Sequence, residues 1–82
     1  MRRTNQGSAY IRKQQLVNRL ARIGYRFVDA GDRVEMYRRP NGAHYVAIPR
    51  TKLVAVETAR SILRQAGLDE DQIGDFLKSA QA

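Results

Sequence analysis

The spacing of the apolar residues changes along this 82-residue chain, and that change constrains its fold more than any other feature. Between Tyr10 and Ile23, apolar side chains recur every three or four residues, which predicts an amphipathic helix. Ser8 or Gly7 can begin this helix, and Gly24 is expected to end it. The segments that follow are short and alternate, as strands do. The sequence therefore predicts one helix followed by a sheet.

Three segments have strand character, namely residues 25–29, 33–39 and 43–48. Between the second and third, residues 40–42 combine proline with Asn-Gly, whose backbone preferences suit a hairpin connection. Consecutive strands joined by short turns pair with each other in opposite directions. We therefore expect a three-stranded antiparallel meander.

Alternation within the second and third strands predicts which side chains face the core. Val34 and Met36 share one face of the second strand, and Val46 and Ile48 are expected to point inward from the third. The opposite face of the second strand is expected to meet solvent or a ligand. That face carries Arg33, Glu35, Tyr37 and Arg39.

Two further helices complete the predicted elements. The apolar run at residues 53–56 fits a loop, a short strand or a first helical turn, and a helix follows at residues 58–66, ended by Gly67. Asp69 and Gln72 form a capping box that predicts a last helix at residues 70–79. The side chains expected to be buried by these helices are Ala59, Ile62, Leu63, Ala66, Ile73, Phe76 and Leu77.

The resulting order is helix, three strands, helix, helix, with the helices on one face of the sheet. This α+β arrangement is the plan of double-stranded-RNA-binding domains, which recognise RNA through its shape and its phosphates. A chain of this length forms one domain. We expect residues 10–80 to make up that domain and residues 1–9 to form a flexible tail.

The positive charge of the chain lies almost entirely in its first part. The net charge is +7, and residues 1–50 carry eleven Lys or Arg against three acidic residues, whereas residues 51–82 carry four against five. Twelve of the basic residues are arginine, whose planar guanidinium grips phosphate through two hydrogen bonds. Nucleic acid is the partner that this balance favours, and the fold plan favours RNA. A basic surface that serves only solubility is the alternative, and membrane-surface or DNA binding is less favoured.

The basic residues and one aromatic residue expected to contact RNA fall into two groups. Arg12, Arg19 and Arg22 lie opposite the apolar stripe of the first helix, with Arg26 just beyond its end, where they can follow a phosphate backbone. The strands and their connections supply the others, which are Arg33, Tyr37, Arg38, Arg39, Arg50 and Lys52.

Cofactors and membrane insertion are not indicated. The chain has no cysteine and a single histidine, so its residues do not suggest a metal cluster. No apolar run approaches the roughly 18 residues of a membrane span, and the first residues lack the apolar centre of a secretion signal. We expect a cytoplasmic protein.

Residues 58–68, which read T-A-R-S-I-L-R-Q-A-G-L, carry a family resemblance. This segment is similar to the T-L-R-S-I-L-x-Q-A-G-L segment of HicA-type toxins, also called the YcfA-like family. Weaker similarity covers Gly24 to Phe27, residues 37–42 and residues 46–49, in the same order as in the family. The resemblance implies a fold like that of double-stranded-RNA-binding domains, mRNA interferase activity and neutralisation by a HicB-type antitoxin.

The resemblance also implies a catalytic histidine, and this chain departs from the family at that position. The second strand of the family opens with G-S-H or G-T-H, whereas here the histidine position falls on Arg33 or Val34. Histidine suits RNA cleavage because its unperturbed pKa near ~6.5 lets it accept or donate a proton. Arginine stays protonated and can only stabilise phosphate charge. A glycine and a lysine that usually precede the later helix are also replaced here.

His44 is the candidate replacement base, with Glu35 as a second possibility. His44 shares the alternation of Val46 and Ile48, which points it toward the core or the sheet edge. Tyr37 and Tyr45 are expected to form either an exposed aromatic pair, on which bases can stack, or a cross-strand packing contact.

Two functions follow from these observations. One is a HicA-like toxin-family protein that binds RNA with weak or lost ribonuclease activity, and this is the function that we favour. The other is an active mRNA interferase that uses a relocated base. A stand-alone nucleic-acid-binding module without an antitoxin is a variant of the first.

Overall fold

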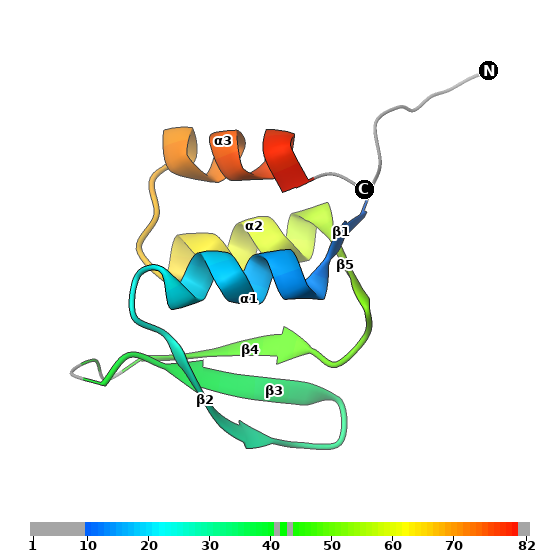
Figure 1. The fold of residues 1–82 in the computed structure, drawn as a ribbon, viewed down its shortest axis with the longest axis vertical. Coiled ribbons are helices and arrows are strands. Elements are labelled where there is room, and N and C mark those ends of the chain that lie inside the picture. The colour runs from blue at the N-terminus through cyan, green and yellow to red at the C-terminus, as the bar shows by residue number, and fades with distance from the viewer. Residues whose placement is uncertain (1–9, 41, 43, 81–82) are drawn as a thin grey trace.

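The computed structural model describes residues 10–40, 42 and 44–80 (Figure 1). It confirms the predicted order of a helix, three strands and two helices, and it adds two short strands, one before the first helix and one after the three strands. The elements are β1 (Tyr10–Arg12), α1 (Lys13–Ala21), β2 (Arg26–Ala30), β3 (Val34–Arg38), β4 (Tyr45–Pro49), β5 (Leu53–Ala55), α2 (Val56–Gln65) and α3 (Glu70–Ala80).

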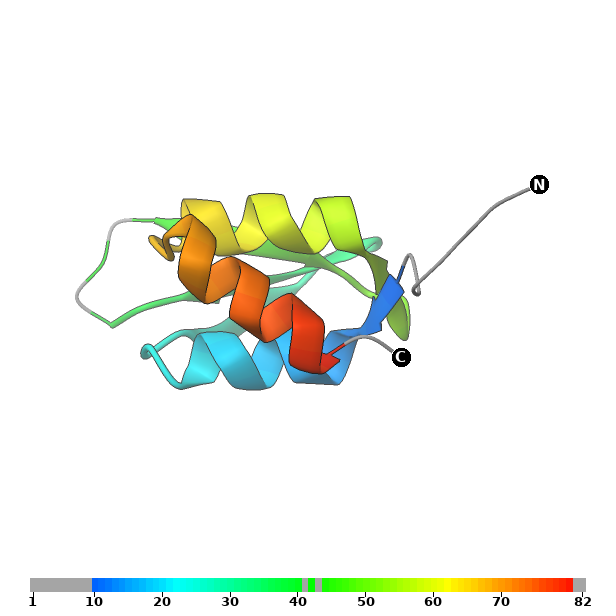
Figure 2. The same ribbon diagram turned by 90° about the horizontal axis from the view of Figure 1, so that it is seen from above.

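The molecule is built in layers. Strands β2, β3 and β4 form an antiparallel sheet in that order, and α1 and α2 lie side by side over one of its faces (Figures 1 and 2). Helix α3 crosses these two helices on the side away from the sheet. The opposite face of the sheet is left uncovered by helices. No helix in the described part of the chain is long and apolar enough to cross a membrane.

Strands β1 and β5 form a second, two-stranded sheet that shortens the predicted first helix. Ile11 pairs with Val54, and both side chains are almost completely buried. The backbone N–H of Lys13 then donates to the carbonyl of Lys52 at 2.8 Å. The helix therefore begins at Lys13 rather than near Tyr10, because residues before it gain a strand partner. Ser8, Gly7 and the tail expected at residues 1–9 lie outside the described residues.

The predicted orientation of the middle strand is wrong. Register places Tyr37 opposite Val46 and Glu35 opposite Ile48, so Glu35 and Tyr37 face the helices while Val34 and Met36 lie on the open face. Tyr37 is only 7% exposed. Its ring packs edge to face against Phe27 at 5.8 Å between centroids, which gives the aromatic side chain an apolar neighbour. The inward orientation of Val46 and Ile48 is confirmed.

The helix ends follow the predicted signals. Gly24 and Gly67 both have φ of +100°, and the N–H groups of these glycines and of the residues after them bond back to the last helical turn. Asp69 and Gln72 form the capping box, since each side chain accepts the other's backbone N–H, at 2.8 and 3.0 Å. At the predicted hairpin, the N–H of Gly42 donates to the carbonyl of Arg39 at 3.1 Å, and Asn41 lies outside the described residues.

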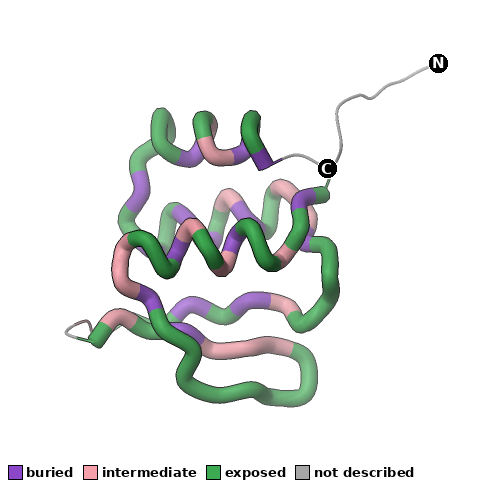
Figure 3. Tube along the Cα trace, viewed as in Figure 1, coloured by how far each residue is buried: buried purple, intermediate pink, exposed green. Residues whose placement is uncertain are grey.

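The core lies between the sheet and the helices (Figure 3). Helix α2 buries the four side chains that the sequence predicts, which are Ala59, Ile62, Leu63 and Ala66. Helix α3 buries Ile73 and Leu77, but Phe76 is only partly buried and packs against the edge of the core. Strand β2 is exposed along its whole length, so the core does not extend to that edge of the sheet.

Candidate nucleic-acid interface

One end of the sheet gathers five basic residues, which we call the first basic cluster: Arg12, Lys13, Arg33, Arg50 and Lys52. The β2–β3 turn, the β4–β5 connection and the start of α1 meet at this end (Figure 1). Arg50 joins two of them, because its backbone N–H donates to the carbonyl of Arg33 at 3.1 Å and its Nη1 donates to the carbonyl of Gly31 at 2.8 Å. The Lys13 to Lys52 backbone bond joins the third.

The start of α1 adds to the positive potential of the first basic cluster. Its first turn contains no acidic residue, and no side chain caps it. The Lys13 N–H is bonded to the Lys52 carbonyl, and the positive end of the helix dipole reinforces the lysine and arginine charges. A groove of about 520 Å³ opens there, lined by Arg12, Lys13, Gln14, Lys52 and Leu53.

Glu35 lies beside the first basic cluster in a network with Lys13 and Tyr37. The Lys13 Nζ is 3.1 Å from Oε2 of Glu35, and the Tyr37 hydroxyl donates to Oε1 at 2.9 Å. The hydrogen bond from Lys13 is the main cause that lowers the pKa of Glu35, with help from Tyr37 and Arg50 against the opposing effect of burial. Burial, followed by the bond to Glu35, raises the pKa of Tyr37 to about 12. Glu35 is thus an ionised carboxylate with both oxygens engaged.

The opposite end of the sheet carries a second basic cluster, defined by Arg26, Arg38 and Arg39. Arg26 and Arg38 are direct cross-strand neighbours on the open face, which places two like charges side by side. The Arg38 guanidinium lies 5.4 Å from the centroid of the exposed Tyr45 ring, and that of Arg39 lies 5.5 Å from the buried Tyr25 ring. These cation–π contacts hold two guanidinium groups against aromatic rings while leaving Arg38 exposed.

His44 lies at this second end and is exposed. It precedes the first residue of β4, whereas Arg33 precedes the first residue of β3, so the two lie at opposite ends of an antiparallel strand pair. The alternation that pointed His44 toward the core fails because the strand begins at Tyr45, after His44. The exposed Tyr37–Tyr45 pair is also wrong, since Tyr37 is buried under the helices and Tyr45 lies opposite Arg38 on the other face.

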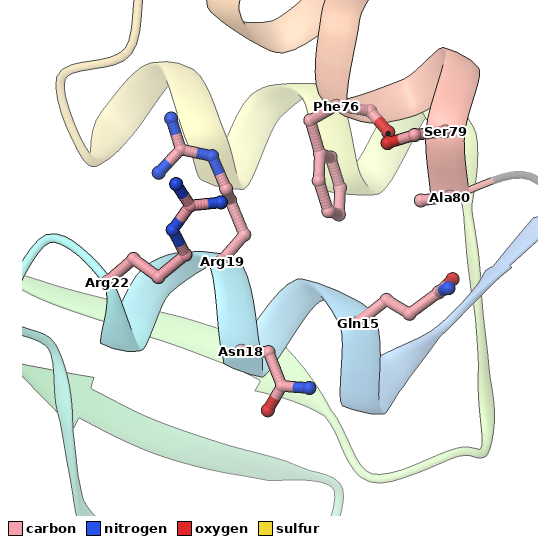
Figure 4. Close-up of a pocket in the computed structure, with 7 residues that line it drawn as sticks. All are labelled: Gln15, Asn18, Arg19, Arg22, Phe76, Ser79 and Ala80. Atoms are coloured by element: carbon pink, nitrogen blue, oxygen red, sulfur yellow. Dashed lines mark hydrogen bonds between the residues drawn. The ribbon is translucent and has the colours of Figure 1, made fainter.

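Arg19 and Arg22 line a groove between α1 and α3 (Figure 4). Arg12 does not share their helical face, because it lies in β1. Two participants of these surfaces were not predicted. Lys13 pairs with a residue 22 positions away, and no local pattern signals that contact. Phe76 was expected in the core, and nothing in the sequence of α3 indicates that its side chain also lines a groove.

The predicted basic residues are thus distributed over two ends of the sheet and one inter-helix groove. Tyr37, the one aromatic residue predicted to contact RNA, is removed from the surface by the fold. Among the described residues, no three His, Asp or Glu side chains gather to hold a metal ion.

Comparison with known protein families identifies the family to which the chain belongs. A family model described as the HicA toxin of bacterial toxin–antitoxin matches residues 14–68, about two thirds of the chain. The match covers α1 from its second residue, the three-stranded sheet, β5 and α2, and it stops before α3. A search of curated proteins finds no match. The chain belongs to the HicA toxin family of bacterial toxin–antitoxin systems.

Proposed function

We propose that this protein is an RNA-binding member of the HicA toxin family with weak or lost ribonuclease activity, acting in the cytoplasm as a single domain over residues 10–80. One observation carries this proposal. The family resemblance expects the catalytic histidine at Arg33 or Val34, and Arg33 belongs to the first basic cluster. The chain's single histidine lies at the other end of the sheet.

The groups near Arg33 support binding better than proton transfer. Arginine and lysine side chains, together with the start of α1, can neutralise phosphates. Glu35 is a poor base at this end, because Lys13 and Tyr37 occupy its oxygens and its pKa is lowered. The same groups that would hold an RNA backbone therefore lack a partner that accepts a proton near neutral pH.

RNA rather than DNA is the proposed ligand of both basic clusters and of Arg19 and Arg22. None of the three helices in the described residues has the features of a recognition helix for the major groove. The fold and the family both favour RNA, since α+β domains of this plan bind it through shape and phosphates.

A salt titration of RNA binding tests the proposal. The double variant Arg12→Gln, Lys52→Gln removes two exposed charges from the groove at the start of α1. We expect the wild type to bind single-stranded RNA with an affinity that falls steeply with salt. The slope of log affinity against log salt should become shallower in the variant by about 0.7 for each lost phosphate contact.

The matched control is Arg64→Gln, Lys78→Gln, which removes the same charge from exposed positions on α2 and α3. Its slope should stay that of the wild type. Equal slopes for all three proteins, or binding that is insensitive to salt, would contradict an RNA interface at the first basic cluster.

An active interferase that uses His44 is the second candidate, because His44 is exposed and lies at the end of the sheet that carries Arg38 and Arg39. Long incubation of purified protein with RNA separates the two. We expect the RNA to remain intact. Cleavage that disappears in His44→Ala would establish the second candidate instead.

The proposed protein partner is a HicB-like antitoxin, as family membership implies. A gene for a small HicB-like protein beside the gene for this chain is the expected genomic observation. A solitary gene would favour a stand-alone RNA-binding module.

A further inference from the structure

Helix α3 lies outside the region that matches the family, and it builds a groove with α1. The groove has a volume of about 210 Å³, below the roughly 300–1,000 Å³ of pockets for drug-sized ligands. It is therefore sized for one unit of a polymer, such as one nucleotide or one amino-acid residue, rather than for a larger ligand. Its lining residues are Gln15, Asn18, Arg19, Arg22, Phe76, Ser79 and Ala80 (Figure 4).

Two arginines define the charge of the groove. Arg19 and Arg22 lie one helical turn apart, and both guanidinium groups point from α1 toward α3 (Figure 4). Within the part of the chain that the structure describes, neither forms an ion pair or a side-chain hydrogen bond. Asp75 lines the neighbouring part of the surface but forms no ion pair with them. Two unpaired positive charges on the same wall favour an anion with several acceptor oxygens.

An aromatic ring faces these arginines. Phe76 projects from α3 toward α1 and is partly buried against the core, so part of its ring remains open to the groove (Figure 4). Ring and cations together suit a group that is flat and apolar at one end and anionic at the other.

The amide side chains complete the set of contacts. Gln15 has no hydrogen-bond partner among the described residues and extends along the groove toward the end of α3 (Figure 4), whereas the Asn18 amide points away from α3 and its Oδ1 accepts from Gln14 at 3.0 Å. The Ser79 hydroxyl donates to the carbonyl of Phe76 at 3.0 Å and is already engaged. Amides are the side chains that both donate to and accept from base edges.

We propose that the α1–α3 groove binds one unpaired nucleotide of single-stranded RNA. A phosphate lies between Arg19 and Arg22, the base stacks on Phe76, and the Gln15 amide contacts the base edge. This inference rests on the proposed RNA-binding function and adds to it a preference for single strands, because a base in a duplex cannot reach the ring.

The test compares a single-stranded oligouridine with a blunt RNA duplex of equal length. Phe76→Leu keeps an apolar side chain against the core but removes the ring. We expect it to weaken oligouridine binding about tenfold, in line with loss of one base-stacking contact, and to leave duplex binding unchanged. Arg19→Gln, Arg22→Gln should make the salt slope for oligouridine shallower by about 0.7 per lost phosphate contact.

Phe27→Leu is the matched control, since Phe27 is an aromatic residue that is 56% exposed on β2. It should leave both affinities as in the wild type, and thermal unfolding should show that all variants are folded. Equal oligouridine affinities for the wild type and Phe76→Leu would overturn the groove, while the Arg12, Lys52 variant still tests the wider RNA interface independently.

A second experiment uses a glutamate-rich peptide with one tyrosine to test whether the groove binds an acidic protein segment instead of a nucleotide. NMR signals of the Phe76 ring should shift with oligouridine and stay in place with the peptide. Shifts with the peptide alone would assign the groove to an acidic protein segment and overturn the nucleotide.

Discussion

Both carboxylate oxygens of Glu35 are engaged, and one of them joins the sheet to the first helix. Lys13 reaches it from α1, and Tyr37 reaches it from two residues along the same strand. The Lys13 and Glu35 side chains are 21% and 17% exposed, so water screens their attraction less than it does at an open surface. At the scale of single residues, this network fixes a polar position on the inner face of the sheet and keeps a carboxylate ionised.

The network predicts a pH dependence of stability with a defined sign. The pKa of Glu35 is lower in the fold than its ordinary value of 4.5, so its stabilisation is present above that value and is lost as the pH falls through the lowered pKa. Tyr37 acts at the other limit. Its pKa rises from 10.0 to about 12, so its contribution is full below pH 10.0 and is lost as the pH rises toward about 12.

The variant Glu35→Gln tests the acidic limit, and its free energy of unfolding is measured in urea from neutral pH to below pH 4.5. We expect the variant to lose about 1 to 3 kcal/mol near neutral pH, because Lys13 loses its charged partner, and to lose less stability than the wild type on acidification. Glu57→Gln serves as a control at an exposed position in the first turn of α2. A Glu35→Gln profile that parallels the wild type throughout would show that the network does not stabilise the fold.

Two glycines in the C-terminal helices have opposite roles at the scale of elements. Gly67 ends α2 with φ of +100°, whereas Gly74 lies within α3. A Cβ atom added at either position would meet nothing within 4 Å. Space is therefore equal at the two sites, and the backbone conformation alone distinguishes them.

We expect Gly67→Ala to destabilise the protein by roughly 1–2 kcal/mol, because alanine is strained at this positive φ. Gly74→Ala should stabilise it by about 0.5–1 kcal/mol, since alanine loses less backbone entropy in a helix. Denaturant unfolding of the two variants beside the wild type measures both changes. A Gly67→Ala variant as stable as the wild type would show that the end of α2 does not depend on the backbone freedom of Gly67.

The elements also show what the sequence could predict and why. Helices α2 and α3 were predictable because their apolar spacing, Gly67 and the Asp69 capping box are local signals. Strand β1 was not, since three residues carry too little pattern and its partner β5 lies about forty residues away. The face of β3 was mistaken because Glu35 and Tyr37 look like surface residues until Lys13 and Phe27 supply their partners.

Some residues of the candidate site could also be predicted from the sequence, and others could not. The surface positions of Arg38 and Arg50 follow from charge alone, whereas the groove at Phe76 depends on how α3 packs across α1. Packing between helices is a tertiary property, and the spacing of residues within one helix does not determine it.

The whole molecule carries its positive charge unevenly, with +7 overall and Arg26 directly beside Arg38 on the open face of the sheet. Like charges on directly paired residues of neighbouring strands repel each other and destabilise the free protein. Added salt shortens the range of that repulsion, from a Debye length of about 30 Å at 0.01 M to about 8 Å at 0.15 M. The same screening weakens attraction to RNA.

We therefore expect salt to raise the thermal unfolding midpoint of the free protein while it lowers RNA affinity. Each ~1 kcal/mol of repulsion relieved should raise the midpoint by about 4–8 °C. Arg26→Gln should raise the midpoint at low salt and reduce the response to salt, since it separates the cross-strand pair. A midpoint that falls with salt, or an Arg26→Gln variant less stable than the wild type, would show that attractive ion pairs dominate instead.

The engaged state of Glu35 supports the proposed loss of ribonuclease activity, and that loss would change how the protein acts in a cell. A nuclease turns over, so a few copies can destroy many messages. A protein that only holds RNA works by occupancy, and each copy silences one segment at a time. Its effect then scales with its abundance relative to its targets, and an antitoxin that forms one-to-one complexes would restore growth in proportion to the dose supplied.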